Sequence, residues 1–265
     1  MIKELIERRK KLKAKFKGCQ RIFAGWTSFG HPSITEIFSK TGVDFIGLDM
    51  EHSTISQKEA QRIIAAAQGE GTLCVPRIAT HNMEMVKHLL DSGADGIMAP
   101  LVSSKEEAEQ IVSWCQYPSA GQRSFGVARA QGYGLDYDEY TREWNDSFSL
   151  IVQIESKQGV ENIEEILSVK AIDGVMIGPY DISGSLGIPG QLEHAKVKAA
   201  CKKVIVACKK FKKSCGNQIV MPDEKNVQAA FNEGFNFVVL GSDLFFLWKC
   251  AERMRSLIKP GKKTV

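Results

Sequence analysis

The segment FIGLDMEHSTIS, at residues 45–56, decides the fold of this chain. Its first residues are apolar or glycine, and Asp49, Glu51 and His52 follow at once. A strand that is apolar at every position is typical of a parallel sheet with both faces covered. The polar residues at its end have two interpretations. Asp, Ser and Thr commonly cap helices, and acids beside a histidine can form a catalytic group.

Eight segments of the chain share this strand-like apolar character, and helical patterns such as QKEAQRIIAAAQGEG (57–71) and KEEAEQIVSWCQ (105–116) lie between most of them. Their spacing of about 20–30 residues is that of one βα unit. The pattern predicts a (β/α)8 TIM barrel with an N-terminal helix, built as one domain over residues 1–265. The predicted strands are RIFAGW (21–26), DFIGLD (44–49), TLCVPR (72–77), GIMAP (96–100), LIVQIE (150–155), GVMIG (174–178), GNQIV (216–220) and FVVLG (237–241).

A doubly wound open sheet is the competing fold. It needs a glycine-rich phosphate loop of the GxGxxG type after its first strand. The segment in that place, GWTSFGHPS (25–33), does not supply one. The barrel is therefore the favoured prediction.

Composition narrows the class of protein. The formal net charge of +4 on 265 residues is too small to indicate a nucleic-acid partner. No apolar run reaches the roughly 18–20 residues that cross a bilayer. Seven scattered cysteines without CxxC spacing, and no secretory signal, indicate a reducing cytoplasm. The basic first helix is expected to be a solvated surface helix, with an acidic partner or a membrane surface as the alternative.

Polar side chains recur where the predicted strands end. In a barrel these carboxyl ends converge on one opening, here called the mouth, and catalytic residues come from several strands. The residues are Asp49, Arg77, Gln153, Glu155 and Asp181. Because an unpaired buried charge is costly, we expect these groups to satisfy each other, a ligand or a metal.

Glu155 and Asp181 follow neighbouring strands, which places two carboxylates side by side. Two oxygen ligands, completed by water and substrate, suit Mg²⁺, Mn²⁺ or a similar divalent ion. The alternative is structural: Asp181 caps the next helix, and Glu155 pairs with a lysine. Two acids at adjacent strand ends favour the metal.

The turn Gly178–Pro179–Tyr180 precedes Asp181 and is a candidate for binding the substrate. Glycine lets a ligand approach the backbone, and successive N–H groups can form an anion nest. Arg77 can hold a carboxylate with two hydrogen bonds or stabilise an oxyanion. An ordinary βα turn is the alternative for residues 178–180.

His52 is the histidine that ends a strand among acids. An imidazole oriented by a carboxylate is a natural general base near neutral pH. His31 also follows a strand, in SFGHPS (28–33), but has no acid beside it. It is a possible substrate contact.

Several motifs together resemble the HpcH/HpaI aldolase family, the class II pyruvate-dependent aldolases of the phosphoenolpyruvate/pyruvate barrel superfamily. They are GVDFIGLDMEH (42–52), VPRI (75–78), GADGIMAPLV (93–102), IVQIES (151–156), GPYDISGSLG (178–187) and FVVLGSD (237–243). The resemblance implies Glu155 and Asp181 as metal ligands and His52 as general base, oriented by Asp49. It implies that Arg77 stabilises the enolate and that Gln153 lies beside the metal.

The resemblance also implies a homo-oligomer, commonly a hexamer, in which neighbouring subunits exchange the last helix. That helix is DLFFLWKCAERMRSL (243–257), whose aromatic residues could also be ordinary core. Two segments depart from the family pattern: Ser124 stands where glycine is usual, and CGNQIVMPD (215–223) is unusual. We expect both to border the part of the mouth that receives the aldehyde.

The expected activity is reversible, metal-dependent cleavage of a 2-keto-4-hydroxy acid to pyruvate and an aldehyde, with Mg²⁺, Mn²⁺ or Co²⁺. No lysine ends a strand, which disfavours a Schiff base. A lyase of the citrate-lyase β-subunit or malyl-CoA type remains an alternative. So do a non-catalytic barrel that binds keto acids and, from the basic first helix, a nucleic-acid binder with salt-dependent affinity.

Overall fold

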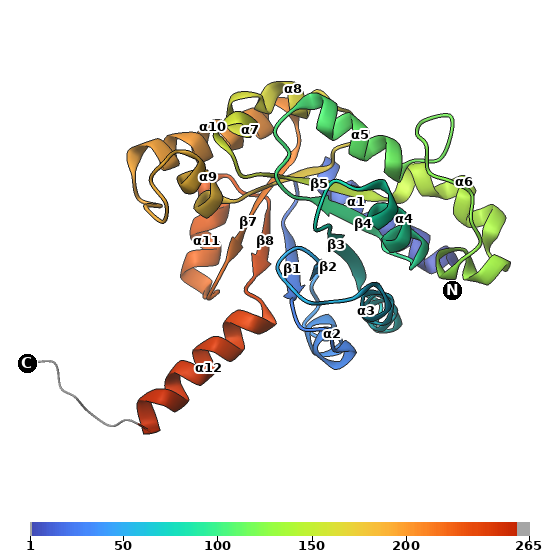
Figure 1. The fold of residues 1–265 in the computed structure, drawn as a ribbon, viewed down its shortest axis with the longest axis horizontal. Helices are drawn as coiled ribbons and strands as arrows, with labels where there is room; N and C mark the ends of the chain where they lie inside the picture. Colours follow the sequence, from blue (N-terminus) through green and yellow to red (C-terminus); the bar gives the residue numbers. More distant parts are fainter. Residues whose placement is uncertain (1, 259–265) are drawn as a thin grey trace, which may run out of the picture.

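A computed structural model describes residues 2–258 and shows a closed barrel of parallel strands in the order β1 to β8 (Figure 1). All eight predicted strands are present. The largest shift is at β7, which begins two residues before its predicted start. The strands are β1 (Ile22–Thr27), β2 (Phe45–Asp49), β3 (Leu73–Arg77), β4 (Gly96–Ala99), β5 (Ser149–Ile154), β6 (Gly174–Ile177), β7 (Ser214–Ile219) and β8 (Phe237–Leu240).

Helices connect the strands and cover the outside of the barrel. Between residues 2 and 258, no helix has the length and apolar character needed to cross a membrane. The helices are α1 (Ile2–Lys17), α2 (Pro32–Ser39), α3 (Gln57–Gly69), α4 (Met83–Asp91), α5 (Lys105–Cys115), η1 (Arg129–Gly134), α6 (Tyr137–Ser147), α7 (Lys157–Glu161), α8 (Ile163–Leu167), α9 (Pro179–Ser185), α10 (Ala195–Phe211), α11 (Glu224–Glu233) and α12 (Asp243–Ile258).

The continuous apolar character of the strands serves two separate cores. Side chains on one face of each strand fill the barrel interior, and those on the other face pack against the helices. In β2, for example, Phe45 belongs to the interior, whereas Ile46 and Leu48 belong to the outer layer. Toward the mouth the side chains of β2 become polar at Asp49. The apolar middle of the barrel thus separates the charged side chains of the mouth from those at the opposite end.

Helix α1 closes the opposite end of the barrel, here called the floor, where the strands begin. Leu12 and Phe16 enter the interior core, and the Phe16 ring lies 6.2 Å from that of Phe45 and 5.6 Å from that of Phe237. The expectation of a solvated surface helix therefore holds for one face only. Arg8 and Lys11 are exposed, whereas Arg9 and Lys13 are buried in ion pairs.

Acidic or amide side chains directly before every second strand hold the floor together. Each accepts a hydrogen bond from a backbone N–H of the preceding strand, which ties neighbouring strands at their start. The donors are Phe23, Cys74, Leu150 and Cys215, and the acceptors are Asp44, Asp95, Asp173 and Asn236, in that order. Cations of α1 then pair with the acids: Arg9 with Asp95 at 2.7 Å, Lys13 with Asp173 at 2.8 Å, and Lys15 with Asp44.

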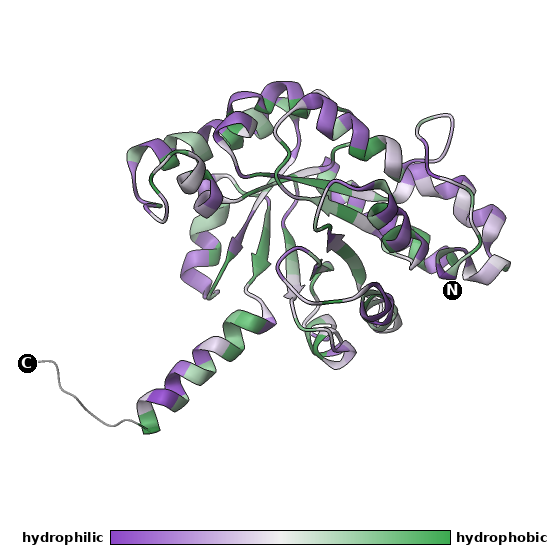
Figure 2. Ribbon diagram, in the orientation of Figure 1, coloured by the Kyte–Doolittle hydropathy of each residue, from purple (hydrophilic) through white to green (hydrophobic). Residues whose placement is uncertain are grey.

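Helix α12 stands away from the barrel beyond its first turn (Figure 1). Its only buried residue in the described range is Asp243, whose carboxylate accepts the N–H groups of Ser28 and Phe29. Figure 2 shows apolar residues along the projecting part of this helix. The helix is therefore anchored by its first turn, where the Phe246 ring also lies 6.1 Å from that of Phe38, and it leaves an apolar surface uncovered by its own barrel.

Candidate active site

Register places Asp49 and Arg77 opposite one another at the ends of β2 and β3. The Arg77 guanidinium donates to both Asp49 oxygens, with Nη2–Oδ2 at 2.7 Å and Nε–Oδ1 at 3.2 Å. The same carboxylate accepts the backbone N–H groups of Glu51 and His52. Asp49 therefore fixes both the arginine and the turn that carries the histidine.

The His52 ring lies near Glu51 rather than against the Asp49 carboxylate. His52 Nε2 is 3.8 Å from Glu51 Oε2, and the imidazole is largely exposed. Glu51 also pairs with Arg77 Nη1 at 3.1 Å. The predicted orientation of the ring by Asp49 is thus replaced by a contact of Asp49 with the His52 backbone, and Glu51 is the carboxylate beside the ring.

Glu155 follows β5 and is buried at the mouth, where it is 6% exposed. Its carboxylate accepts a hydrogen bond from the Gln153 amide at 3.1 Å and from the backbone N–H of Leu101 at 3.0 Å. A Cβ on Gly178 would lie 2.7 Å from the Glu155 side chain. Glycine at 178 therefore leaves room for this carboxylate. The alternative in which Glu155 pairs with a lysine is wrong.

Burial raises the pKa of Glu155 to about 7. The N–H of Leu101 lowers this pKa, while the neighbouring charge of Asp181 raises it. Burial also raises the pKa of Glu51, and the Arg77 charge opposes that shift. Carboxyl groups with raised pKa values, gathered in one place, are typical of functional sites.

Asp181 lies in the first turn of α9, after the strand that neighbours β5. The residue at the helix N-cap is Gly178, and no side-chain cap is formed there, so the alternative of Asp181 as a cap is wrong. Asp181 is exposed at the mouth, and its charge influences both Glu51 and Glu155. Its carboxylate is therefore placed to meet a ligand.

The expected anion nest at residues 178–180 is only partly available. The Gly178 N–H donates to Ile154 in the barrel ladder, and Pro179 has no N–H. Tyr180 is exposed at the start of α9. Any anion at this turn would have to use N–H groups from Tyr180 onward. Gly178 also leaves the room that the Glu155 side chain occupies.

Two contacts at the mouth were not predicted from the sequence. The Trp26 ring from β1 lies under Arg77, with the guanidinium carbon 5.0 Å from the ring centre. Gly47 makes room for this indole, since a Cβ there would lie 2.2 Å from it. Leu101 adopts a left-handed φ of 53° and turns its N–H toward Glu155. The position of Trp26 at the end of the first predicted strand could have indicated that its ring lies at the mouth. Nothing in the sequence indicated that the N–H of Leu101 binds Glu155.

Two other predicted positions lie elsewhere. His31 caps α2, since its Nδ1 accepts the Ser33 N–H. Ser124 follows Arg123, whose buried guanidinium contacts Asp91 at the end of α4. Because α4 ends where β4 is about to begin, this segment lies toward the floor of its own barrel. The expectation that Ser124 borders the mouth of the same subunit is therefore wrong.

The mouth fits a divalent cation by the charge and chemistry of its side chains. Arg77 pairs with Asp49 and Glu51, whereas Glu155 and Asp181 form no salt bridge with a residue from 2 to 258, which leaves an excess of negative charge. Glu155 and Asp181 carry the carboxylate oxygens that divalent cations take as ligands. Over residues 2–258, no three His, Cys, Asp or Glu side chains are gathered into a ready metal cage.

The fold and the mouth define a (β/α)8-barrel enzyme with functional residues at the carboxyl ends of its strands. The chain belongs to the HpcH/HpaI aldolase/citrate lyase family, whose model matches residues 23–249. It is a carbon–carbon lyase of this family.

Named relatives cover nearly the whole chain. It is 32% identical over 244 residues to the hydroxypyruvate/pyruvate aldolase of Roseobacter denitrificans, spanning 91% of this chain and 94% of that protein. It is 34% identical over 239 residues to the 2-keto-3-deoxy-L-rhamnonate aldolase of Escherichia coli, spanning 89% and 88%. The crystal structure of a family member from Burkholderia cenocepacia superposes with a TM-score of 0.87 at 25% identity, covering 94% of this chain and 99% of that one.

Proposed function

We propose that this enzyme cleaves a 2-keto-4-hydroxy acid to pyruvate and an aldehyde, reversibly, with a divalent cation held by Glu155 and Asp181. The observation that carries the proposal is the excess of carboxylates around Arg77, with Glu155 buried among them at a pKa of about 7. A buried carboxylate is costly without a compensating charge. A cation that also meets an anionic substrate would supply it.

Arg77 is proposed to bind the 2-keto oxygen. Its guanidinium is held by Asp49 and Glu51 and supported by the Trp26 ring, so its position is set before substrate arrives. Donors fixed in this way stabilise developing negative charge without reorganising. As the C3–C4 bond breaks, its electron pair passes into the pyruvate enolate, whose oxygen Arg77 would stabilise.

His52 is proposed to take the proton of the 4-hydroxyl group. Loss of that proton lets the C4–O bond become the aldehyde carbonyl while the C3–C4 pair leaves. The exposed ring of His52 can reach a substrate at the mouth, and Glu51 beside it would stabilise the imidazolium. Protonation of the enolate at C3 completes pyruvate. Synthesis uses the same steps in reverse.

Glu155 and Asp181 would hold the cation, with Gln153 orienting Glu155. The bound cation supplies Lewis-acid stabilisation of the keto acid and its enolate. Ionised Glu155 is required for this, and its raised pKa means that cation binding and loss of the Glu155 proton are linked. Protons should therefore be released when the cation binds near neutral pH.

The test is pyruvate release from a panel of 2-keto-4-hydroxy acids, including 2-keto-3-deoxy sugar acids, with Mg²⁺ or Mn²⁺ and then with excess chelator. The name of the Escherichia coli relative suggests 2-keto-3-deoxy-L-rhamnonate for the first panel. The name of the Roseobacter denitrificans relative suggests hydroxypyruvate, beside pyruvate, as the keto acid to add to an aldehyde when the reaction is run in the direction of synthesis. Turnover that depends on the cation is the expected result. Absence of pyruvate from every substrate, with cation demonstrably bound, would contradict the proposal and favour the CoA-thioester lyase.

We infer that the enzyme is a homo-oligomer in which α12 packs on a neighbouring subunit. Leu247, Trp248, Met254 and Leu257 are each at least half exposed on this helix. Side chains of this kind seldom face water in a contiguous patch unless a partner covers them. Sedimentation of the full chain should show an assembly that Leu247→Glu with Trp248→Glu shifts to smaller species. A full chain that remains monomeric at high concentration would overturn the inference.

We also propose a cytoplasmic location. All seven cysteines are free thiols in the structure. Free thiols persist in a reducing compartment. Fractionation of the native host, followed by detection of this chain in the cytoplasmic fraction, is the direct test.

A further inference from the structure

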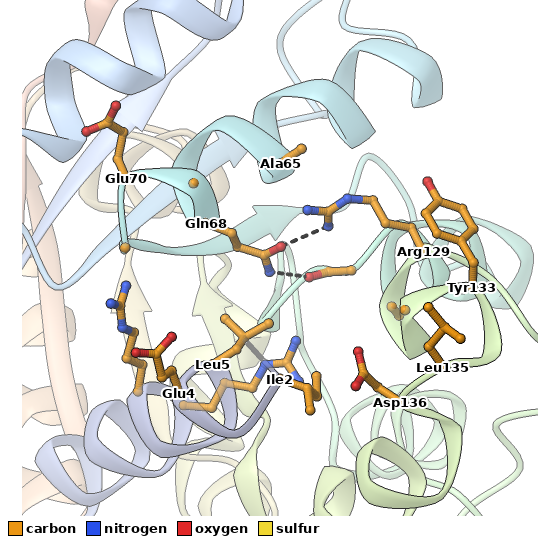
Figure 3. Close-up of a pocket in the computed structure, with 17 residues that line it drawn as sticks. Ile2, Glu4, Leu5, Ala65, Gln68, Glu70, Arg129, Tyr133, Leu135 and Asp136 are labelled. Carbon is orange, nitrogen blue, oxygen red and sulfur yellow. Dashed lines mark hydrogen bonds between the residues drawn. The ribbon is translucent and has the colours of Figure 1, made fainter.

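A cavity of about 770 Å³ opens at the floor of the barrel, away from the mouth (Figure 3). Its position follows from the elements that line it. They are α1, the end of α3, the turn before β4, and η1 with the residues that follow it. Gly71 and Gly93 stand directly before the starts of β3 and β4, whereas Arg77 stands at the far end of β3. The volume is in the range of small-molecule sites.

Two guanidinium groups form part of the wall of the cavity. Arg129 donates to the Gln68 side chain at 2.8 Å and to the Ser92 carbonyl at 3.0 Å, so its position is fixed. Arg8, on the exposed side of α1, makes no ion pair with any residue from 2 to 258. Arg9 is fully buried beside them and pairs with Asp95, and both of its terminal nitrogens lack a hydrogen-bond partner among these residues.

Glycines on this wall let the guanidinium groups lie close to the backbone. A Cβ on Gly71 would lie 2.2 Å from Arg8, and a Cβ on Gly93 would lie 2.4 Å from Arg129. Both glycines also have positive φ values, 82° and 99°, which other residues rarely adopt. Each of these two turns therefore leaves room for one cationic side chain at the cavity.

The other walls limit what an occupant can be. Figure 3 shows Ile2, Glu4 and Leu5 on the α1 side and Tyr133, Leu135 and Asp136 on the η1 side. Tyr133 and Leu135 are strongly exposed apolar surfaces, at 71% and 92%. Glu70 is already neutralised by Lys40 at 2.6 Å, but Glu4 and Asp136 disfavour a second negative charge on the ligand. One anionic head with an apolar body fits these walls better than a polyanion.

We propose that this cavity binds a small organic acid with one carboxylate or phosphate group joined to an apolar or aromatic body. The head lies on the wall of Arg8 and Arg129, and the body lies against Tyr133 and Leu135. Charge-assisted hydrogen bonds from guanidinium groups are the strong contacts for such a head. The site is independent of the proposed reaction at the mouth, because no residue of that mouth lines the cavity.

Calorimetric titration of the full-length enzyme with benzoate and with phenyl phosphate tests the proposal. The two probes separate a carboxylate head from a phosphate head. Two controls carry one part of the proposed ligand each. Inorganic phosphate has the anionic group without an apolar body, and benzyl alcohol has the aromatic body without an anionic group. We expect at least one aromatic acid to bind with a Kd below about 1 mM, and both controls to bind more weakly. Absence of binding by both acids would overturn the proposal.

Matched variants locate the binding. Arg8→Gln should weaken the aromatic acid about tenfold, the effect of losing one charged hydrogen bond, with turnover unchanged. Lys11→Gln removes the same charge from an exposed position of α1 outside the cavity and should change neither. Arg77→Gln should leave the binding intact. Binding that survives Arg8→Gln and is lost with Arg77→Gln would place the ligand at the mouth and overturn the proposal, as would a crystal structure with another part of the assembly filling the cavity.

Discussion

The two ends of the barrel treat acidic side chains in opposite ways. At the floor, Asp95 and Asp173 each accept a backbone N–H and pair with a cation of α1 at 2.7 and 2.8 Å. At the mouth, Arg77 pairs with Asp49 and Glu51, but buried Glu155 has no cation paired with it among residues 2–258, and its pKa is raised to about 7. The buried acids Asp95 and Asp173 of the floor are compensated by the chain itself, whereas Glu155 at the mouth is not.

This difference indicates that the floor contributes mainly to stability and the mouth mainly to the reaction. A buried acid that is fully paired has no capacity left for a ligand. A buried acid that lacks compensation keeps a cost that a bound cation can remove. The same division between a stabilising end and a reactive end is general in TIM barrels. Here it can be tested by changing acids at each end and measuring activity and stability separately.

Glu155→Gln should have the largest effect on activity. The amide keeps the shape that Gly178 and Leu101 accommodate but cannot carry the negative charge that a divalent cation needs. We expect no measurable cation-dependent turnover and no high-affinity Mn²⁺ binding by calorimetry, with the fold intact by circular dichroism. An unchanged Mn²⁺ titration in this variant would break the comparison at the mouth.

His52→Ala should lower kcat by about 10²–10⁴, the range for loss of a general base. The exposed ring is not part of either core, so the free energy of unfolding should stay within about 0.5 kcal/mol of the wild type. Steady-state kinetics and urea denaturation on the same preparation give both values. A loss of activity below tenfold would mean that another group takes the proton.

In contrast to His52→Ala, Asp95→Asn should lower the free energy of unfolding and leave catalysis unchanged. It leaves the buried Arg9 guanidinium without its counter-charge, which is expected to cost about 3–5 kcal/mol in the free energy of unfolding. Substrate KM should not change at temperatures where the variant is folded. Denaturation with urea, with kinetics below the transition, measures the two effects.

Two further variants sharpen this prediction at the floor. Glu193→Gln removes an acid whose pair with Lys198 is exposed, and it should leave the urea midpoint unchanged within error. Arg9→Met combined with Asp95→Asn should recover much of the loss, because no charge is then left unpaired. If the double variant is as unstable as Asp95→Asn, the cost comes from the lost hydrogen bonds of Asp95 and not from the charge of Arg9.

Much of the fold could be predicted from the sequence because the strands are apolar throughout and regularly spaced. The placement of α1 could not. Arg9 and Lys13 read as surface residues until their partners, Asp95 and Asp173, are brought to them by folding. An ion pair between residues so far apart in the chain leaves no local pattern, and the acid or amide before every second strand is recognised only once the strands are known.

The mouth was predictable to the extent that strand ends converge in a barrel. Asp49, Arg77 and Glu155 could be placed there from position alone. Their partners could not, because side-chain pairing depends on rotamers and on register between strands. Thus Asp49 contacts Arg77 and not the His52 ring, and the N–H of Leu101 reaches Glu155 only through a left-handed backbone conformation.

A pH dependence of stability should come from Glu155 when chelator keeps cations away. Its pKa rises from an ordinary value of 4.5 to about 7 on folding. Between these values the folded state binds the extra proton, so stability falls as pH rises, by up to about 3 kcal/mol in total. Glu155→Gln removes this contribution, so the variant should gain stability relative to wild type from about pH 5 to about pH 8. Urea denaturation at each pH measures the difference.

Mn²⁺ should oppose the loss of stability in the wild type alone, because it favours the ionised carboxylate. A difference in stability between the two proteins that does not vary with pH would mean that Glu155 ionises at its ordinary pKa. The charge of Glu155 at the mouth would then be compensated as fully as the charges of the acids at the floor.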